Sequence, residues 1–407
     1  MNQLPPTHLN KIWNSMYTCI FTANSLMFLG IQMVNTLVAK YADALGASPA
    51  IVGVVSSLFA LTALMLKIVS GPAIDAFSRK KILIAAISVI AISFVGFSVS
   101  GNVQMLFVFR LLQGCGQAFT ATCCLAIVAD ALPSDKFGVG IGTFTLAQAA
   151  CQAIGPIAGL TLAQNFGYRV AFAAAAACTL CAVFAAACVK VPARTRTKFH
   201  ITSDSIIAKE AILPAALLLL LQITFCNINA FLVLFADERG VGNIGYFFTV
   251  YAVSMMFAPR LTGRLADRLG TAKAVLPAMG CLAVSFLIIS LADTLPVFLL
   301  AAVVSAFGYG AAQPAVQALC MKCVPQNRRG AASSTSYIGQ DLGNLAGPIA
   351  AGAIADWYGY VVMWRFMIIP VGIAAAVTLL FRKRISRVEA AFSHTPAFKD
   401  LAASESS

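Results

Sequence analysis

The amino-acid sequence predicts an all-α membrane protein of twelve transmembrane helices, built as two related six-helix halves. Of its 407 residues, 60% are hydrophobic and 11% are charged, which leaves too little polar surface for a soluble protein of this length. Apolar runs recur along the chain, each about 18 residues or longer and so able to cross a hydrocarbon layer of about 30 Å as a helix. The third observation is an internal repeat with a period of 192 residues.

The apolar runs give the positions of the helices. The chain lacks the alternating segments of about ten residues that form membrane β-barrels, and an open sheet cannot satisfy its backbone in lipid. Helices therefore remain. We expect the spans at residues 13–37, 50–70, 82–100, 104–130, 138–163 and 170–189 in the first half, and at 211–236, 243–262, 274–292, 296–320, 331–354 and 361–381 in the second.

The distribution of basic residues predicts the orientation. The net charge is +13, but nearly all basic residues outside the spans fall on one predicted side, and only Lys40, Arg169 and Arg239 fall on the other. Because cytoplasmic loops are enriched in Lys and Arg, this pattern places both termini in the cytoplasm and argues against a nucleic-acid partner. No cleavable signal peptide is evident, so the first span is expected to be retained in a multi-pass protein of the inner membrane.

The repeat divides the chain into domains. At the 192-residue offset, Gly71 and Asp75 match Gly263 and Asp267, Gly155-Pro156 matches Gly347-Pro348, and Gly167-Tyr168 matches Gly359-Tyr360. We expect a six-helix bundle at 1–190, a cytoplasmic linker at 191–210, a second bundle at 211–383 and a cytoplasmic tail at 384–407. Six spans per half give both halves the same orientation, which predicts a pseudo-twofold axis along the membrane normal and a central cavity.

A charged turn follows span two and is repeated after span eight. The copies read Gly71-Pro-Ala-Ile-Asp75-Ala-Phe-Ser-Arg79 and Gly263-Arg-Leu-Ala-Asp267-Arg268. They resemble the GxLADRxGRR loop of the major facilitator superfamily, and the resemblance extends over essentially the whole chain. It implies that Asp75 and Arg79 latch the cytoplasmic side shut. The copies depart from the pattern at Ala76, Ser78, Thr271 and Ala272, so the latch is expected to be asymmetric; an ordinary charged turn is the alternative.

Span four carries an intramembrane arginine in the run Arg110-Leu-Leu-Gln113-Gly114. A charged side chain at this depth is costly, so it should face a cavity and have a partner. The run resembles the RxxQG motif of proton-coupled members of the family, which implies a role for Arg110 in proton movement, whereas fixing helix packing is the alternative. By the same resemblance, Asp130 at the end of span four is expected to pair with Arg79 and to take part in the proton coupling and charge relay.

Span five resembles the family's antiporter motif, GxxxxxxxxGxxxGPxxGG, at Gly142, Gly155, Pro156 and Gly159, with Cys151 and Leu160 in place of two glycines. Small residues leave a groove for close helix contact, and the proline permits a bend. The motif implies export rather than uptake. Span eleven carries the same Gly347 and Pro348, however, so the pattern could instead reflect packing that both halves share.

An acidic residue, Asp341, lies about 16 Å into span eleven at 1.5 Å per residue, near the expected midplane. Intramembrane acids usually mark ion pathways, and burial favours a carboxyl that takes up and releases protons near neutral pH; a packing role is the alternative. Some of the amide side chains in the spans should line the substrate cavity, although many buried amides bond neighbouring helices. The candidates are Gln32, Asn35, Gln113, Gln117, Gln222, Asn227, Gln313, Gln340 and Asn344.

These motifs together resemble the drug and metabolite proton antiporter branch of the superfamily. They predict a monomeric, proton-coupled exporter of a small amphipathic or cationic molecule, with neither cofactor nor metal. The alternatives are an importer or uniporter on the same fold and, from another class, a non-transporting receptor. An enzyme is disfavoured because the sequence has no catalytic triad, nucleotide loop or metal cluster. The twelve cysteines, including the isolated Cys320 and Cys323 pair, are expected to be free thiols in packed positions.

Overall fold

The computed structural model describes residues 12–132, 136–189, 207–258, 270–324 and 328–393. Every regular element in these ranges is helical, and ten segments are long and apolar enough to cross a bilayer. One of the ten, Ala331–Leu380, is 50 residues long and contains both predicted spans eleven and twelve, while span eight corresponds to the shorter helix Gly245–Met255. The predicted fold class is therefore confirmed.

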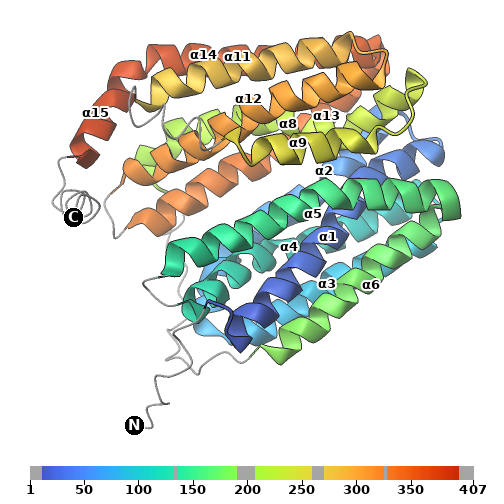
Figure 1. Ribbon diagram of the computed structural model, residues 1–407, viewed down its shortest axis with the longest axis horizontal. Coiled ribbons are helices and arrows are strands. Elements are labelled where there is room, and N and C mark those ends of the chain that lie inside the picture. The colour runs from blue at the N-terminus through green and yellow to red at the C-terminus, as the bar shows by residue number, and fades with distance from the viewer. Residues whose placement is uncertain (1–11, 133–135, 190–206, 259–269, 325–327, 394–407) are drawn as a thin grey trace. The chain divides into compact units, whose positions relative to one another are not determined.

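The chain forms two compact units. Met1–Ile201, Asn229–Leu234 and Asn243–Ala252 belong to the first, and Thr202–Ile228, Phe235–Gly242 and Val253–Ser407 to the second. The helices of Figure 1 are α1 (Ser15–Ala44), α2 (Pro49–Ala76), α3 (Arg79–Val99), α4 (Val103–Ala131), α5 (Phe137–Phe166), α6 (Tyr168–Cys188), η3 (Lys209–Ala211), α8 (Ile212–Glu238), α9 (Gly245–Met255), α11 (Thr271–Ser290), α12 (Leu295–Lys322), α13 (Arg329–Phe366), α14 (Ile368–Leu380) and α15 (Arg382–Ser393).

Several helices extend beyond the predicted spans. The first span was expected to end at residue 37, but α1 continues to Ala44. Lys40 and Asp43 lower the hydropathy of this last stretch without interrupting the helix, which stops only where Gly46 takes a positive φ of 82°. Likewise α2 continues to Ala76, so Gly71 and Asp75 lie in its last turns rather than in a loop. Hydropathy marks the membrane-embedded part of a helix, not its ends.

In the first unit, α1 packs against α5 and α6, α4 packs against α2 and α3, and α3 also contacts α6 (Figure 1). Fully buried aromatic rings fill the contact between α3 and α6, where the centroids of Phe97 and Phe172 lie 5.6 Å apart. At the start of α1, the Tyr17 hydroxyl donates to the carbonyl of Gly140, at 2.7 Å. These two contacts hold α3 against α6 and the start of α1 against the start of α5.

In the second unit, α11 packs against α12, α13 and α14. Trp364, which is fully buried, stacks on Phe286 with ring centroids 6.0 Å apart and planes 18° apart. Phe286 lies 192 residues after Phe94, and Trp364 lies 192 residues after Phe172, both of which are core residues of the first unit. The two bundles therefore build their cores from equivalent positions.

Two further pairs of equivalent positions support the duplication. A Cβ added at Gly116 would lie 2.5 Å from Ile90, and one added at Gly308 would lie 2.8 Å from the Cα of Leu282, which is the residue equivalent to Ile90. Gly167 has φ 86° and ψ 163°, and Gly359 has φ 82° and ψ 165°. Only glycine tolerates this backbone region. Gly167 stands between α5 and α6, and Gly359 stands at a kink inside α13.

Candidate functional site

Arg110 lies at the centre of a polar cluster in the first unit. Its side chain is buried, with 1% exposure, and its Nη1 donates to Gln113 Oε1 at 2.9 Å and to Asn35 Oδ1 at 3.4 Å. Asn35 Nδ2 in turn donates to Gln32 Oε1 at 3.3 Å. The guanidinium carbon also lies 5.2 Å from the centroid of the Phe59 ring. Four residues selected from the sequence thus meet in one cluster, which draws on α1 and α4 and is completed by a ring of α2.

A close contact between α2 and α4 places the Phe59 ring over Arg110. Gly114, one turn after Arg110, has no side chain to separate the helices, and a Cβ there would collide with the backbone of Phe59 and the hydroxyl of Thr62. Thr62 Oγ1 donates to the carbonyl of Leu111 at 2.8 Å, which fixes the crossing. The close approach of α2 and α4 therefore explains why a glycine stands at position 114 of the Gln113-Gly114 motif.

The charge of Arg110 is balanced by amides and a ring rather than by a carboxylate. In the described ranges, Arg110 forms no ion pair, and its Nε has no hydrogen-bond partner. Gln113 Nε2 is buried and unpartnered as well. A cation held this way retains unused donors, so the cluster can accept an anionic or hydrogen-bonding group.

The second unit contains a polar and aromatic cluster around Gln222 of α8. Tyr309 of α12 donates its hydroxyl to Gln222 Oε1, and Gln222 Nε2 donates to Asn344 Oδ1 of α13 at 2.7 Å. The Tyr309 ring stacks on Phe225, with centroids 3.8 Å apart and planes 11° apart. Tyr309, Phe225 and Gln222 are buried and Asn344 is half-buried, and none of the four side chains has a formal charge.

Glycines of α13 bring Gln222 to this position. A Cβ at Gly343 would lie 2.6 Å from the Cβ of Gln222, and one at Gly347 would lie 2.5 Å from Cys226 Sγ, so α8 and α13 touch at both glycines. Pro348 lies inside α13 directly after Gly347. Any larger residue at these two positions would separate Gln222 from Asn344.

The equivalent glycines of α5 pack against α1. A Cβ at Gly155 would lie 2.6 Å from the Cβ of Gln32, and one at Gly159 would lie 3.0 Å from the carbonyl of Met33. Pro156 is buried inside α5 between them. Gly142 differs, because an added Cβ there would meet no atom within 4 Å among the described residues. Among the described residues there is therefore no close helix contact at Gly142.

The remaining amide candidates do not join either cluster. Asn227 donates to the carbonyl of Ile223 at 2.8 Å and to Met367 Sδ at 3.0 Å, so it fixes helix packing rather than facing a cavity. Gln313 donates to Gln317 at 2.8 Å, one turn further along α12. Gln117 of α4 and Gln340 of α13 are half-buried, and Gln340 Nε2 has no partner in the described part of the chain.

Asp341 is half-buried in α13, twelve residues after the helix begins, which corresponds to a depth of about 18 Å. It follows Gln340 directly and lies between Gly339 and Gly343, which both contact α8. Its repeat equivalent in α5 is Ala149, so the carboxyl is not a requirement of the shared packing. Of the titratable groups in α13, Asp341 lies closest to the middle of the helix.

At the end of α4, Asp130 and Arg79 form the ion pair that the sequence predicts. Arg79 Nη1 lies 2.6 Å from Asp130 Oδ2, and the two side chains are 12% and 32% exposed. The pair joins the end of α4 to the start of α3. Gly71 and Asp75 are described only as backbone in the last turns of α2. Gly263, Asp267 and Arg268 of the second copy lie outside the described residues.

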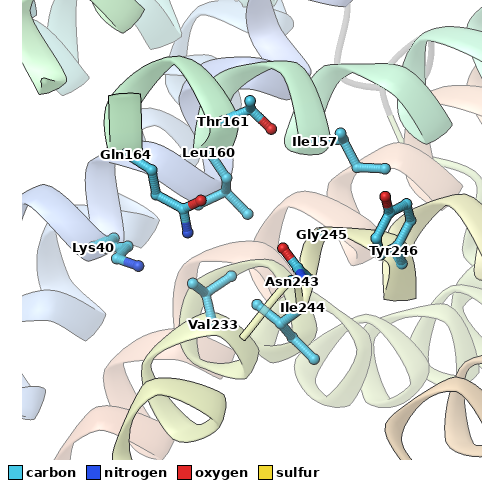
Figure 2. Close-up of a pocket in the computed structure, with 10 residues that line it drawn as sticks. All are labelled: Lys40, Ile157, Leu160, Thr161, Gln164, Val233, Asn243, Ile244, Gly245 and Tyr246. Carbon is cyan, nitrogen blue, oxygen red and sulfur yellow. The ribbon is translucent and has the colours of Figure 1, made fainter. Parts of the chain in front are cut away.

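The first unit also contains a hollow of about 60 Å³ near the end of α5 (Figure 2). Lys40 of α1 and Gln164 of α5 lie on one side of it, and Asn243 and Tyr246 on another. A ligand pocket usually has a volume of about 300–1,000 Å³. The hollow holds a few water molecules at most, so it is not a candidate for binding an organic solute.

The cysteines provide no metal site. All twelve are free thiols, and the described residues contain no group of three His, Cys, Asp or Glu side chains that could hold a metal ion. Cys323 lies at the end of α12, where burial raises the pKa of its thiol and the Arg384 guanidinium opposes that shift.

Sequence reasoning missed the aromatic residues of both clusters, namely Phe59, Phe225 and Tyr309. An aromatic residue in an apolar helix carries no signal of its own, because most such rings pack in the core or face lipid. Tyr309 could have been found through the repeat, since it is the equivalent of Gln117, which was a candidate.

Comparisons with known proteins give a consistent result. The family model described as Major Facilitator Superfamily matches residues 20–242 and 213–404. The chain is 28% identical over 325 residues to multidrug resistance protein MdtG of Escherichia fergusonii, covering 74% of this chain and 78% of the relative. It is 23% identical over 374 residues to the multi-drug resistance efflux pump PmrA of Streptococcus pneumoniae, covering 86% and 91%.

Among solved structures, the nucleoside transporter NupG has the same fold. A crystal structure of it aligns with a TM-score of 0.78 at 14% identity, covering 90% of this chain and 99% of NupG. At this identity the likeness concerns the arrangement of helices alone.

Proposed function

Because the chain belongs to the major facilitator superfamily, we propose that it is a proton-coupled exporter that moves a small organic molecule by alternating access. Membership makes it a transporter rather than an enzyme. The names of its curated relatives, a multidrug resistance protein and a multidrug efflux pump, favour outward transport. The antiporter motif at Gly155, Pro156 and Gly159 favours the same direction.

The observation that carries the proton coupling is the environment of Arg110. A buried cation that has amides as partners lowers the energy of any negative charge brought near it and raises that of any positive charge. Such a group favours release of a proton from a carboxyl that approaches it and disfavours uptake. If the distance between Arg110 and a carboxyl changes with the conformation of the protein, the proton affinity of that carboxyl changes as well. Coupling of proton movement to transport requires such a change.

Asp341 is the proposed proton carrier. A half-buried carboxyl about 18 Å into α13 can lose its proton in a wet environment and regain it in a dry one, because desolvation disfavours the charged form. Arg110 and Asp341 belong to different halves of the repeat, and neither has a charged equivalent in the other half. The proposed coupling therefore uses one specialised residue from each half.

The cluster around Gln222 is the proposed recognition surface for the transported molecule. Its aromatic faces, from Phe225 and Tyr309, suit an apolar or aromatic group, and the amides of Gln222 and Asn344 supply hydrogen bonds. This chemistry favours an amphipathic molecule. Gln313 and Gln340 would extend the surface along α12 and α13.

The Arg79–Asp130 pair is the proposed latch of the first half, together with Asp75. Arg79 is 12% exposed and Asp130 is 32% exposed, so the pair is screened less by solvent than a fully exposed pair, which contributes little. Gly263, Asp267 and Arg268 would form the second latch. We further propose a monomer with both termini in the cytoplasm, supported by the basic residues that gather on one predicted side of the membrane.

Proton flux in proteoliposomes tests the proposal. A panel of fluorescent amphipathic dyes would be added to vesicles that contain the native protein and a pH indicator, and dye-induced proton movement would be recorded. We expect flux with the native protein and none with Asp341→Asn. The matched control is Asp356→Asn, an exposed acid on the same helix, which should leave the flux unchanged.

Two results would contradict the proposal. If Asp341→Asn retained dye-induced proton flux, Asp341 would not be the carrier. If cells expressing the native protein accumulated the dyes and a protonophore left the accumulation unchanged, the protein would be an importer or uniporter instead.

A further inference from the structure

The short helix α15 follows the last membrane helix, α14, and packs against α11 and α12 of the second unit. Only Phe381 separates it from α14, so it begins directly after the last segment that is long and apolar enough to cross a bilayer. Ile385 is buried, with 3% exposure, and packs with Leu319 of α12 and Ala272 of α11. Val388, three residues later on the same face, packs against the same cluster. The helix is therefore anchored to the bundle by its apolar face.

The other face of α15 is strongly basic. Arg382, Lys383, Arg384 and Arg387 are all exposed and fall within six consecutive positions. Placed directly after a membrane helix, these side chains lie at the depth of the lipid headgroups. A basic cluster at this depth attracts anionic lipid, because each cation near the surface gains from the negative potential there.

A cavity of about 200 Å³ opens beside this basic face. Leu213 and Pro214 of α8, Leu319 of α12 and Val388 of α15 give it an apolar wall, and Arg384 lies at its edge. An apolar cavity of about 150 Å³ is large enough to bind benzene, so this one can hold part of an acyl chain. The cavity and the basic face together match a molecule with an apolar chain and an anionic head.

The charges around the cavity leave Arg384 available to such a head group. Glu210 also lines the cavity, but its carboxylate lies 2.7 Å from Arg328 Nη1 and is thereby compensated. In the described part of the chain, Arg384 forms no ion pair and no side-chain hydrogen bond. Its guanidinium can therefore bind two phosphate oxygens at once.

We propose that α15 and the cavity beside it form a binding site for one anionic phospholipid of the bilayer. Arg384 binds the phosphate, and Arg387, one turn further along the helix, adds a second cation. The end of one acyl chain enters the cavity, whose apolar wall is formed by Leu213, Leu319 and Val388. The site depends on membrane embedding only, and the proposed direction of transport and its coupling do not enter the argument.

Lipid retention by the purified full-length protein tests the proposal. Native mass spectrometry in detergent would compare phosphatidylglycerol with phosphatidylcholine, and glycerol phosphate would test whether the phosphate alone suffices. We expect one phosphatidylglycerol per protein, at least tenfold preference over phosphatidylcholine, and no binding of glycerol phosphate. The double variant Arg384→Gln with Arg387→Gln should lose the preference. Arg169→Gln, an exposed arginine at the start of α6, is the matched control and should keep it.

Two further measurements test the acyl chain separately from the charge. Val388→Trp fills the cavity and should reduce phosphatidylglycerol retention at least fivefold while all four basic residues remain. Cys323 lines the cavity, so bound lipid should slow its alkylation, whereas the exposed Cys188 should react at an unchanged rate.

Each alternative has its own result. Equal retention of both lipids, or retention that survives the double arginine variant, would overturn the charge selectivity and with it the proposal. Binding of glycerol phosphate as tight as that of the lipid would make this a site for soluble phosphate compounds. Unchanged retention in Val388→Trp, with the protein still folded by thermal scanning, would remove the cavity from the site.

Discussion

Replacing Arg110 by methionine separates a functional role of this residue from a structural one. Methionine has a similar length and no charge. Burying an arginine costs about 2.5–3.5 kcal/mol at the centre of a membrane helix and at most this much at Arg110, which lies nearer the start of α4. The substitution removes that cost. It also removes the bond to Gln113 and the contact with the Phe59 ring, which contribute about 1.5–3 and 0.5–2 kcal/mol respectively.

The burial cost that the substitution removes and the two contacts that it loses nearly cancel in the free energy of unfolding. We expect the free energy of unfolding of Arg110→Met to lie within about 2.5 kcal/mol of the native value, whereas dye-induced proton flux should fall at least tenfold. Unfolding would be followed by titration with a denaturing detergent. Phe94→Ala, which empties a fully buried position in α3, is the control and should lose about 3–5 kcal/mol.

The outcome separates the two roles clearly. A loss of 4 kcal/mol or more in Arg110→Met would show that the cluster holds the bundle together, as a packing role requires. Retained flux together with retained stability would refute the reasoning from charge, because the cation would then be dispensable for coupling.

Three other experiments have defined expectations. Gly359→Ala should lower the free energy of unfolding by about 1–3 kcal/mol, because only glycine tolerates the backbone conformation at residue 359. In the same titration, Gly142→Ala should be neutral or stabilising, because an added Cβ at residue 142 meets no described atom within 4 Å. Tyr309→Phe should lower the free energy of unfolding by about 1–2 kcal/mol, because it leaves the buried Oε1 of Gln222 unpaired. It should also raise the KM for dye export more than it lowers the maximal rate. A change confined to the maximal rate would contradict the recognition role. A double-mutant cycle with Arg79→Gln and Asp130→Asn should give a coupling of about 0.2–1 kcal/mol that shrinks in high salt, and a salt-independent coupling would indicate a more buried pair than the structure has.

The fold could be predicted from the sequence because its two signals are strong and independent. Long apolar runs allow few structures in lipid, and rare residues such as Pro156 and Pro348 coincide at one offset. The helix ends were predicted less well. Lys40 lies inside α1 and Asp75 inside α2, since a helix tolerates charged residues in the turns that leave the hydrocarbon layer.

The candidate site could be predicted only in part. Charged and amide residues are conspicuous in an apolar helix, so Arg110 and Gln222 could be selected by composition. Their partners could not, because a ring such as Phe59 looks like any other core residue until the helix crossing is known. Asn227 shows the converse: it is the repeat equivalent of Asn35, but Ala302 takes the place of the arginine, and the amide turns to Met367 instead.

The very short connection between α5 and α6 restricts how the first bundle can be labelled and altered. Gly167 is the only residue between the end of α5 at Phe166 and the start of α6 at Tyr168, so the ends of the two helices cannot move apart. An epitope or fluorophore inserted there would pull apart the contacts that both helices make with α1. The connection between α1 and α2 is longer, at residues 45–48, and therefore offers a far safer place for a reporter of conformational exchange.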